Sequence, residues 1–278
     1  MKGGRGKRVA MGAGVLGIVV LIATGVALKD WIREEYWLRK FFERLGKNAQ
    51  GYSEYRHKET GIVFVRLLGG KFLIGAQNDD PKAANYEPAD DPYAGPVREV
   101  TLGPFLIGKC EVTQGQWEPI TLENPSSSKG RDLPVEGVSW NDCQWFCRKV
   151  GLKLPTMAQF WYAHGAGAPE LHAGSGEAED IGLCQGIREN SPAVPQDQPN
   201  TYGLHDMSDD LEWCEDVSDK AFYSKPEASG VNPVYTTGSK RRVLRVGSFR
   251  DHRGWFGQGD PDVRLRGVGL RVVASPPP

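Results

Sequence analysis

Five cysteines carry the most reactive side chains of the 278-residue chain: Cys110, Cys143, Cys147, Cys184 and Cys214. Thiolates bind soft metals, but the spacing of these five matches no zinc site. Cys143 and Cys147 lie four residues apart in a predicted helix, so both fall on one helix face. This pattern favours buried apolar thiols over a metal-binding pair.

Acidic residues gather in a second segment, "MSDDLEWCED", at residues 207–216. Asp209, Asp210, Glu212 and Asp216 supply the hard oxygen ligands that Ca²⁺ prefers. A calcium site at Asp210 and Glu212 is one interpretation of this segment. A solvated acidic turn is the other.

A third segment, "FRDHRGWFGQG" at residues 249–259, mixes arginine, histidine and aromatic residues. Asp251 could orient the imidazole of His252, but no second histidine is spaced to complete an iron site. Arginine and tryptophan are enriched at the energetic centres of protein interfaces. We therefore expect this segment to contact a partner through Arg250, His252, Arg253 and Trp255.

The elements that carry these segments follow an apolar front end. Residues 1–8 form a basic leader, and residues 9–28 are uncharged. At about 1.5 Å per residue these 20 residues span about 30 Å as a helix, the thickness of the bilayer core. The basic leader favours a single-pass inner-membrane protein whose main domain lies in the periplasm or outside the cell. A cleaved signal peptide is the alternative.

Residues 29–46 continue with apolar residues at helical spacing and end at a glycine. The pattern predicts an amphipathic stalk helix, with Trp31, Trp37 and Phe41 as further candidates for contact with a partner or a membrane. Residues 47–60 are polar and are interpreted as a linker.

From residue 61 the sequence changes to short strands, turns and two helices. Apolar residues alternate on both sides of two glycines in residues 61–76, which predicts a β-hairpin. Two further strands are expected in residues 96–117, and others near 243–245 and 270–273. The pattern indicates an α+β, loop-rich domain from 61 to 275, with 276–278 as a tail.

Both helices are predicted from their ends. In "SWNDCQWFCRKVG", Ser139 and Asp142 have the spacing of a capping box, and Gly151 supplies the stop. In "LPTMAQFWYAHGAG", Thr156 is the expected N-cap and Gly165 ends the helix.

The overall charge of −1 argues against nucleic acid as a partner. The partners expected from the sequence are the lipid bilayer, through Val9–Leu28, and subunits of a membrane protein complex.

Seven blocks carry a family resemblance over residues 61–275: "GGKFLIGA", "EVTQGQW", "LPVEGVSWNDCQWFC", "LKLPTMAQFWYA", "PNTYGLHDM", "RVLRVGSF" and "VGLRVVA". In this order they resemble the formylglycine-generating enzyme (sulfatase-modifying factor) family. The resemblance implies a C-type-lectin-like fold variant with two central helices, small sheets and long loops. Seven ordered blocks are far more specific than one short motif.

The resemblance also implies a copper site, made by two cysteines in a closing block of the form G-S-W/Y-x-C-x-x-x-x-C-x-R. In this chain Asp251 and Phe256 stand at those positions, and no cysteine follows Cys214. Copper and formylglycine formation are therefore not expected. The family's "GNVWEW" segment implies calcium, but its counterpart here is one residue shorter, and no other cofactor is expected.

These observations predict a catalytically degenerate domain that serves as a structural or binding subunit of a membrane protein complex. The alternative is a divergent periplasmic oxidoreductase that uses the same cleft, with Asp251, His252 and Arg253 as its polar groups. A third interpretation is lectin-like ligand recognition by Arg250–Gly259.

Overall fold

The computed structural model describes residues 28–85, 95–165, 199–207, 211–219, 224–238, 240–246 and 255–276. The chain divides into two units, Met1–Phe42 with Pro276–Pro278, and Glu43–Ser275. Each unit is considered by itself. The leader and nearly all of the predicted membrane span, residues 1–27, lie outside the described residues.

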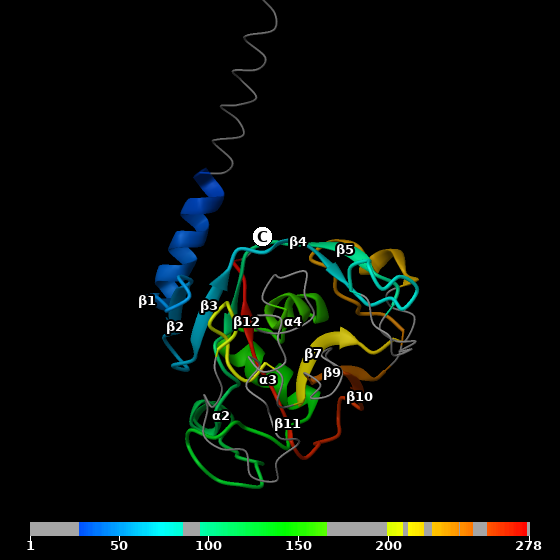
Figure 1. Ribbon diagram of the computed structural model, residues 1–278. Coiled ribbons are helices and arrows are strands. Elements are labelled where there is room, and N and C mark those ends of the chain that lie inside the picture. Colours follow the sequence, from blue (N-terminus) through cyan, green and yellow to red (C-terminus); the bar gives the residue numbers. More distant parts are fainter. Residues whose placement is uncertain are drawn as a thin grey trace, which may run out of the picture. The chain divides into compact units, whose positions relative to one another are not determined.

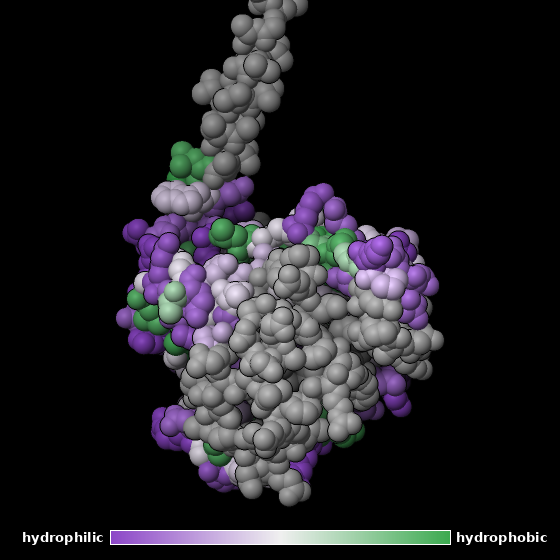
Figure 2. Space-filling view, viewed as in Figure 1, coloured by the Kyte–Doolittle hydropathy of each residue, from purple (hydrophilic) through white to green (hydrophobic). Residues whose placement is uncertain are grey.

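In the first unit, residues 28–41 are helical, followed by strand β1 at Phe42–Lys47. The prediction of a stalk helix to residue 46 was therefore wrong at its end, because strand pairing begins at residue 42. Trp31 is 60% exposed and Phe41 41% exposed, whereas half-buried Trp37 contacts the Phe41 and Phe42 rings. Figure 2 shows hydrophobic atoms where this helix begins. No helix within the described ranges is both long and apolar enough to cross a membrane.

The described residues of the second unit form three small sheets. The largest has the order β1-β2-β3-β6-β12. Its further strands are β2 (Ser53–His57), β3 (Val63–Leu67), β6 (Phe105–Gly108) and β12 (Val273–Ala274). Residues 47–60, expected as a linker, thus contribute β2, which pairs antiparallel with β3. The domain begins earlier than predicted because β2 covers one side of β3.

The other two sheets have the orders β10-β9-β7-β11 and β4-β5-β8. Their strands are β7 (Leu211–Val217), β9 (Arg242–Val246), β10 (Trp255–Gly259), β11 (Val268–Gly269), β4 (Gly70–Ile74), β5 (Arg98–Leu102) and β8 (Gly230–Val231). A short 3₁₀ helix, η2 (Pro226–Ala228), precedes β8. Figure 1 shows the three groups of strands around α3 and α4.

The predicted hairpin at residues 61–76 is wrong, because β3 pairs with β2 and β6 while β4 pairs with β5. Gly69 makes this change of sheet feasible. Its φ is +71°, and a Cβ there would lie 2.2 Å from the carbonyl oxygen of Leu102. Only glycine combines this backbone conformation with so close an approach.

In the described residues of the second unit, three helices each begin after a Ser or Thr N-cap: α2 (Gln114–Thr121), α3 (Trp140–Val150) and α4 (Met157–His164). The predicted capping residues of α3 and α4 are confirmed, including Gly151 at φ 70°. Helix α2 was missed, although the Gln116 side chain accepts a hydrogen bond from the Thr113 N–H at 3.0 Å, as in a capping box.

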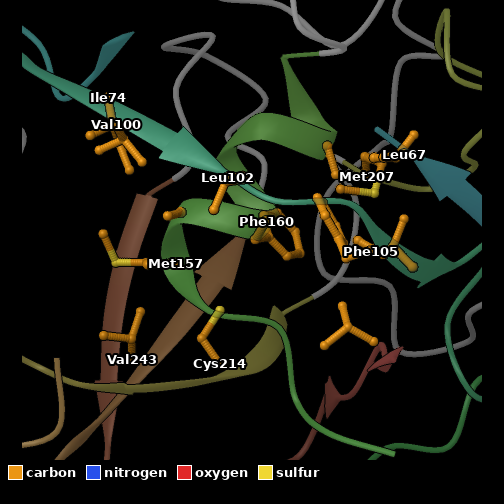
Figure 3. Packing of buried hydrophobic residues seen from close by; sticks show 14 of the residues in the cluster. Leu67, Ile74, Val100, Leu102, Phe105, Met157, Phe160, Met207, Cys214 and Val243 are labelled. Atoms are coloured by element: carbon orange, nitrogen blue, oxygen red, sulfur yellow. The ribbon is translucent and has the colours of Figure 1, made fainter. Parts of the chain in front are cut away.

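The core is built around α4. Figure 3 shows its Met157 and Phe160 among residues of all three sheets, such as Phe105, Val100 and Val243. At the C-terminal end of α4, Asn200 donates to the Ala163 carbonyl at 2.8 Å and accepts from two backbone N–H groups of its own turn. The helix is therefore fixed at its end as well as along its faces.

Arg271 carries a buried charge that joins distant parts of the chain. It is 0% exposed and lies just before β12. Its Nε donates to both carboxylate oxygens of Glu212 at 3.1 and 3.3 Å, and its Nη atoms donate to the carbonyls of Gly108 and His205 at 3.0 and 2.9 Å. Burial alone would lower the pKa of Arg271, but Glu212 and Glu111 outweigh burial and raise it. The guanidinium stays charged inside the protein.

Asp216 makes a second buried connection, between β7 and the start of α4. Its carboxylate accepts from the Met157 N–H at 2.7 Å and from the Tyr235 N–H at 2.9 Å. Burial raises the pKa of Asp216 to about 6, although both hydrogen bonds act to lower it.

The first prediction concerns the buried ion pair. We expect Arg271→Met to reduce the free energy of unfolding by about 3–5 kcal/mol, since it leaves the Glu212 carboxylate buried without its cation. Arg271→Met combined with Glu212→Leu should recover most of that loss, because both charges are then gone. Denaturant unfolding of the three proteins measures this. Equal stability of the single and double variants would show that the pair is not the cause.

The second prediction concerns pH. Because the pKa of Asp216 is higher in the folded chain than the ordinary value of 3.8, its contribution to stability is full below that value and is lost as pH rises through about 6. For one fully buried group the change is about 3 kcal/mol. The difference in unfolding free energy between the wild type and Asp216→Asn should fall by that amount over this range. A difference that grows with pH would mean that the fold lowers the pKa of this carboxyl below 3.8 instead of raising it.

Candidate functional site

The segment expected to carry function connects β9 and β10. The two strands are antiparallel, with Trp255 opposite Val246 and Gly259 opposite Arg242. Arg250, Asp251, His252 and Arg253 lie outside the described residues. Trp255 and Phe256 are placed at the start of β10, with Phe256 opposite Arg245.

The donor set at this hairpin does not fit copper. Phe256 has no atom that can ligate a metal, and Cu(I) prefers sulfur. Cys143, Cys147 and Cys214 are buried, and burial raises the pKa of the Cys143 and Cys147 thiols. Burial also raises the pKa of the half-buried Cys110 thiol to about 11. The described cysteines lie in α3, in β7 and after β6, so none of them is part of this hairpin; Cys184 lies outside the described residues.

The residues expected for calcium are divided. Asp209 and Asp210 lie outside the described residues, whereas Glu212 binds Arg271 and Asp216 binds two backbone N–H groups. In the part of the chain that is described, no group of three or more His, Cys, Asp or Glu side chains is placed to hold a metal. Calcium at Asp210 and Glu212 stays a prediction.

A different cluster lies between α3 and residues of β7 and β9, the two central strands of the four-stranded sheet. The Arg242 guanidinium carbon lies 3.9 Å from the centroid of the Trp140 ring, and the Trp140 Nε1–H donates to the Cys214 carbonyl at 2.9 Å. One turn later, the Gln144 amide donates to the Glu215 carboxylate. Further along α3, the Lys149 amine lies 5.2 Å from the centroid of the Trp145 ring.

Glu215 lies where the pairing of β7 with β9 is irregular, between Trp213 and Val217. Its N–H bonds the Pro155 carbonyl at 2.9 Å instead of β9. Such a bulge turns a side chain away from the regular alternation. Burial raises the pKa of Glu215, while Gln144, Arg242, Lys153 and Arg148 act to lower it.

Sequence reasoning missed both buried Arg271 and the α3 cluster. A signal existed for each. Arg271 is a lone charge within the apolar run "VGLRVVA", and such a position requires a buried partner. On α3, Trp145, Arg148 and Lys149 have spacings that place them opposite the buried positions, and Trp140 lies at the border between the two sides.

Known proteins resemble the chain over most of its length. Chaperone protein LppX of Paenibacillus barcinonensis is 26% identical over 178 residues, which are 42% of this chain and 64% of that protein. Serine/threonine-protein kinase pkn1 of Chlamydia caviae is 31% identical over 218 residues, 69% of this chain and 33% of the kinase. The chain thus spans less than two thirds of both relatives. The formylglycine-generating enzyme of Thermomonospora curvata is 22% identical over 298 residues, 79% and 95% of the two chains.

Two solved structures share the fold. Treponema denticola variable protein 1 has a TM-score of 0.64 at 21% identity and covers 81% of this chain and 99% of its own. PvdO from Pseudomonas aeruginosa has a TM-score of 0.62 at 19% identity, covering 83% and 97%. Residues 50–276 match the family model of the sulfatase-modifying factor enzyme 1-like domain. The chain belongs to this family, which confirms the resemblance carried by its seven sequence blocks.

Proposed function

We propose that this chain is a membrane-anchored, extracytoplasmic binding subunit, in which a formylglycine-generating-enzyme-like domain contacts a protein partner without copper chemistry. The observation that carries the proposal is that no cysteine follows Cys214. The family resemblance puts Phe256, in β10, and Asp251 at the two positions where it implies copper ligands. A domain that keeps its scaffold without the ligands of its reaction retains a shaped surface.

The N-terminal residues support the same role. The uncharged segment at residues 9–28 is long enough to anchor the chain, and the basic leader favours an extracytoplasmic domain. Beyond it, Trp31 and Phe41 are exposed on a helix. Exposed aromatic side chains next to a membrane suit contact with lipid headgroups or another membrane subunit.

The names of the relatives support a role other than formylglycine formation. One relative is named a chaperone and another a serine/threonine-protein kinase, alongside formylglycine-generating enzymes. Domains at this distance in sequence therefore occur in proteins of several kinds.

The third prediction tests the absence of copper chemistry. The full chain, extracted from membranes and exposed to copper, should hold much less than one copper per chain and should leave a sulfatase-type cysteine peptide unchanged in mass. A formylglycine-generating enzyme assayed in parallel is the positive control. Formylglycine in the peptide would contradict the proposal. So would stoichiometric copper that disappears in Cys110→Ser, since that thiol is the least buried of those described.

The fourth prediction tests the binding role. The full chain, gently extracted from membranes, should co-purify with a partner. Trp255→Ala combined with Arg253→Ala should weaken that assembly by about 2–4 kcal/mol, the usual scale for interface hot spots. The matched control is Leu122→Ala with Lys82→Ala, an apolar and a basic residue that are both exposed elsewhere. Unchanged co-purification of the first variant would refute the contact, and loss of folding would place the two side chains in the core.

A further inference from the structure

We propose that the outer side of α3 is a docking surface for an acidic polypeptide segment. This surface, called the α3 basic face, consists of Trp140, Trp145, Arg148, Lys149, Lys153 and Arg242. It goes beyond the binding role proposed above, because it lies on other residues and does not depend on residues 250–255.

The α3 basic face extends from Trp140, at the border of the buried side of the helix, across its exposed side. Trp140, Gln144 and Arg148 follow one another at four-residue spacing, and Trp145 and Lys149 form a second, exposed row beside them. Glu215 connects the first row to β9, because it binds Gln144 and is electrostatically attracted by Arg148, Lys153 and Arg242. Since Arg242 of β9 also stacks on Trp140, α3 and β9 both contribute side chains to this face.

The charge of the surface calls for an acidic partner. Three cations, Arg148, Lys153 and Arg242, act electrostatically on one carboxylate, that of Glu215, and exposed Lys149 follows Arg148 in the chain. Glu215 itself is half-buried, and its pKa is raised, so it neutralises its surroundings incompletely. A partner that brings further carboxylates would balance the remaining positive charge.

Arg242 has hydrogen-bonding capacity to spare. Within the described residues it donates a hydrogen bond from Nη1 to the Glu215 carbonyl at 3.4 Å, which is long. The stack on Trp140 fixes the plane of the guanidinium. The Nε is buried without an acceptor in the described part of the chain, so a partner's carboxylate would bind the two Nη groups, which a guanidinium held in one plane presents side by side.

The composition of the surface favours a polypeptide over a bilayer. Trp145 is 40% exposed, and it is the large exposed apolar residue that α3 contributes. Each tryptophan ring has a cation against one face, and the other exposed residues of α3 are polar, so the helix has little apolar surface to insert among lipid chains. Tryptophan and arginine side by side are instead typical of protein interface centres.

The fifth prediction measures binding of a labelled oligoglutamate peptide to the full chain in detergent, by fluorescence anisotropy. Arg148→Glu combined with Lys149→Glu should weaken binding at least about tenfold, because two attractions become repulsions. The matched control is Lys58→Glu with Lys82→Glu, two exposed lysines on other turns with the same change of charge, and it should alter binding less than about twofold. The basic leader is common to all variants, so its attraction for the peptide cancels in the comparison.

Two further variants keep the test decisive if the double reversal disturbs folding, which thermal unfolding would reveal. Lys153→Glu and Trp145→Ala should each weaken binding several-fold while co-purification through Trp255 and Arg253 is retained. If the α3 and the control charge-reversal variants weakened peptide binding equally, the proposal would be overturned, since the peptide would then be attracted by the overall charge of the chain and not by this surface. It would also be overturned if the α3 reversal abolished binding to vesicles of phosphatidylserine and phosphatidylcholine but left peptide binding unchanged, because the surface would then face a membrane.

Discussion

The buried pairing of Arg271 with Glu212 is the interaction on which the rest of this domain depends. It joins the segment before β12 to β7, and the same guanidinium binds the carbonyl of Gly108, the last residue of β6, and that of His205, which precedes β7. A fully buried cation cannot exchange these partners for water, so all four segments must arrive together. The short strands β11 and β12, two residues each, gain their positions from this contact more than from their own ladders. The scaffold is thus fixed from inside.

A scaffold fixed in this way leaves its surface free to change. Arg271 and Asp216 bind groups in β6, β7, the start of α4 and the turn before β9, all within the described scaffold. The sequence between β9 and β10 can therefore differ among family members while these contacts are kept. The contacts that stabilise the scaffold thus come from residues other than those at which the family resemblance implies a reaction.

Local signals predicted the elements that depend on local physics. The caps of α3 and α4 were found because Ser139, Thr156 and Gly151 satisfy backbone groups within a few residues. Strand partners could not be found this way, since alternation at residues 61–76 reveals which face is buried but not which strand lies alongside. For the same reason, β2 was not predicted within the expected linker, and the start of β1, where the N-terminal helix ends, was not predicted either. At the site, the sequence alone shows that no cysteine follows Cys214. The contacts among Arg242, Trp140 and Glu215 could not be predicted, because they depend on a bulge in β7.

The two proposed contact surfaces are connected by one structural element. Arg242 begins β9, and the segment that contains Arg250 to Trp255 follows the far end of that strand. Five residues of a strand extend roughly 13–17 Å, so both surfaces fit within the side of a single interface of ordinary size, about 800 Å² per partner. A partner with an acidic segment and an aromatic-accepting pocket at that separation would engage both at once. Binding at the second surface would then be intramolecular, and each weak contact would contribute more than it does alone.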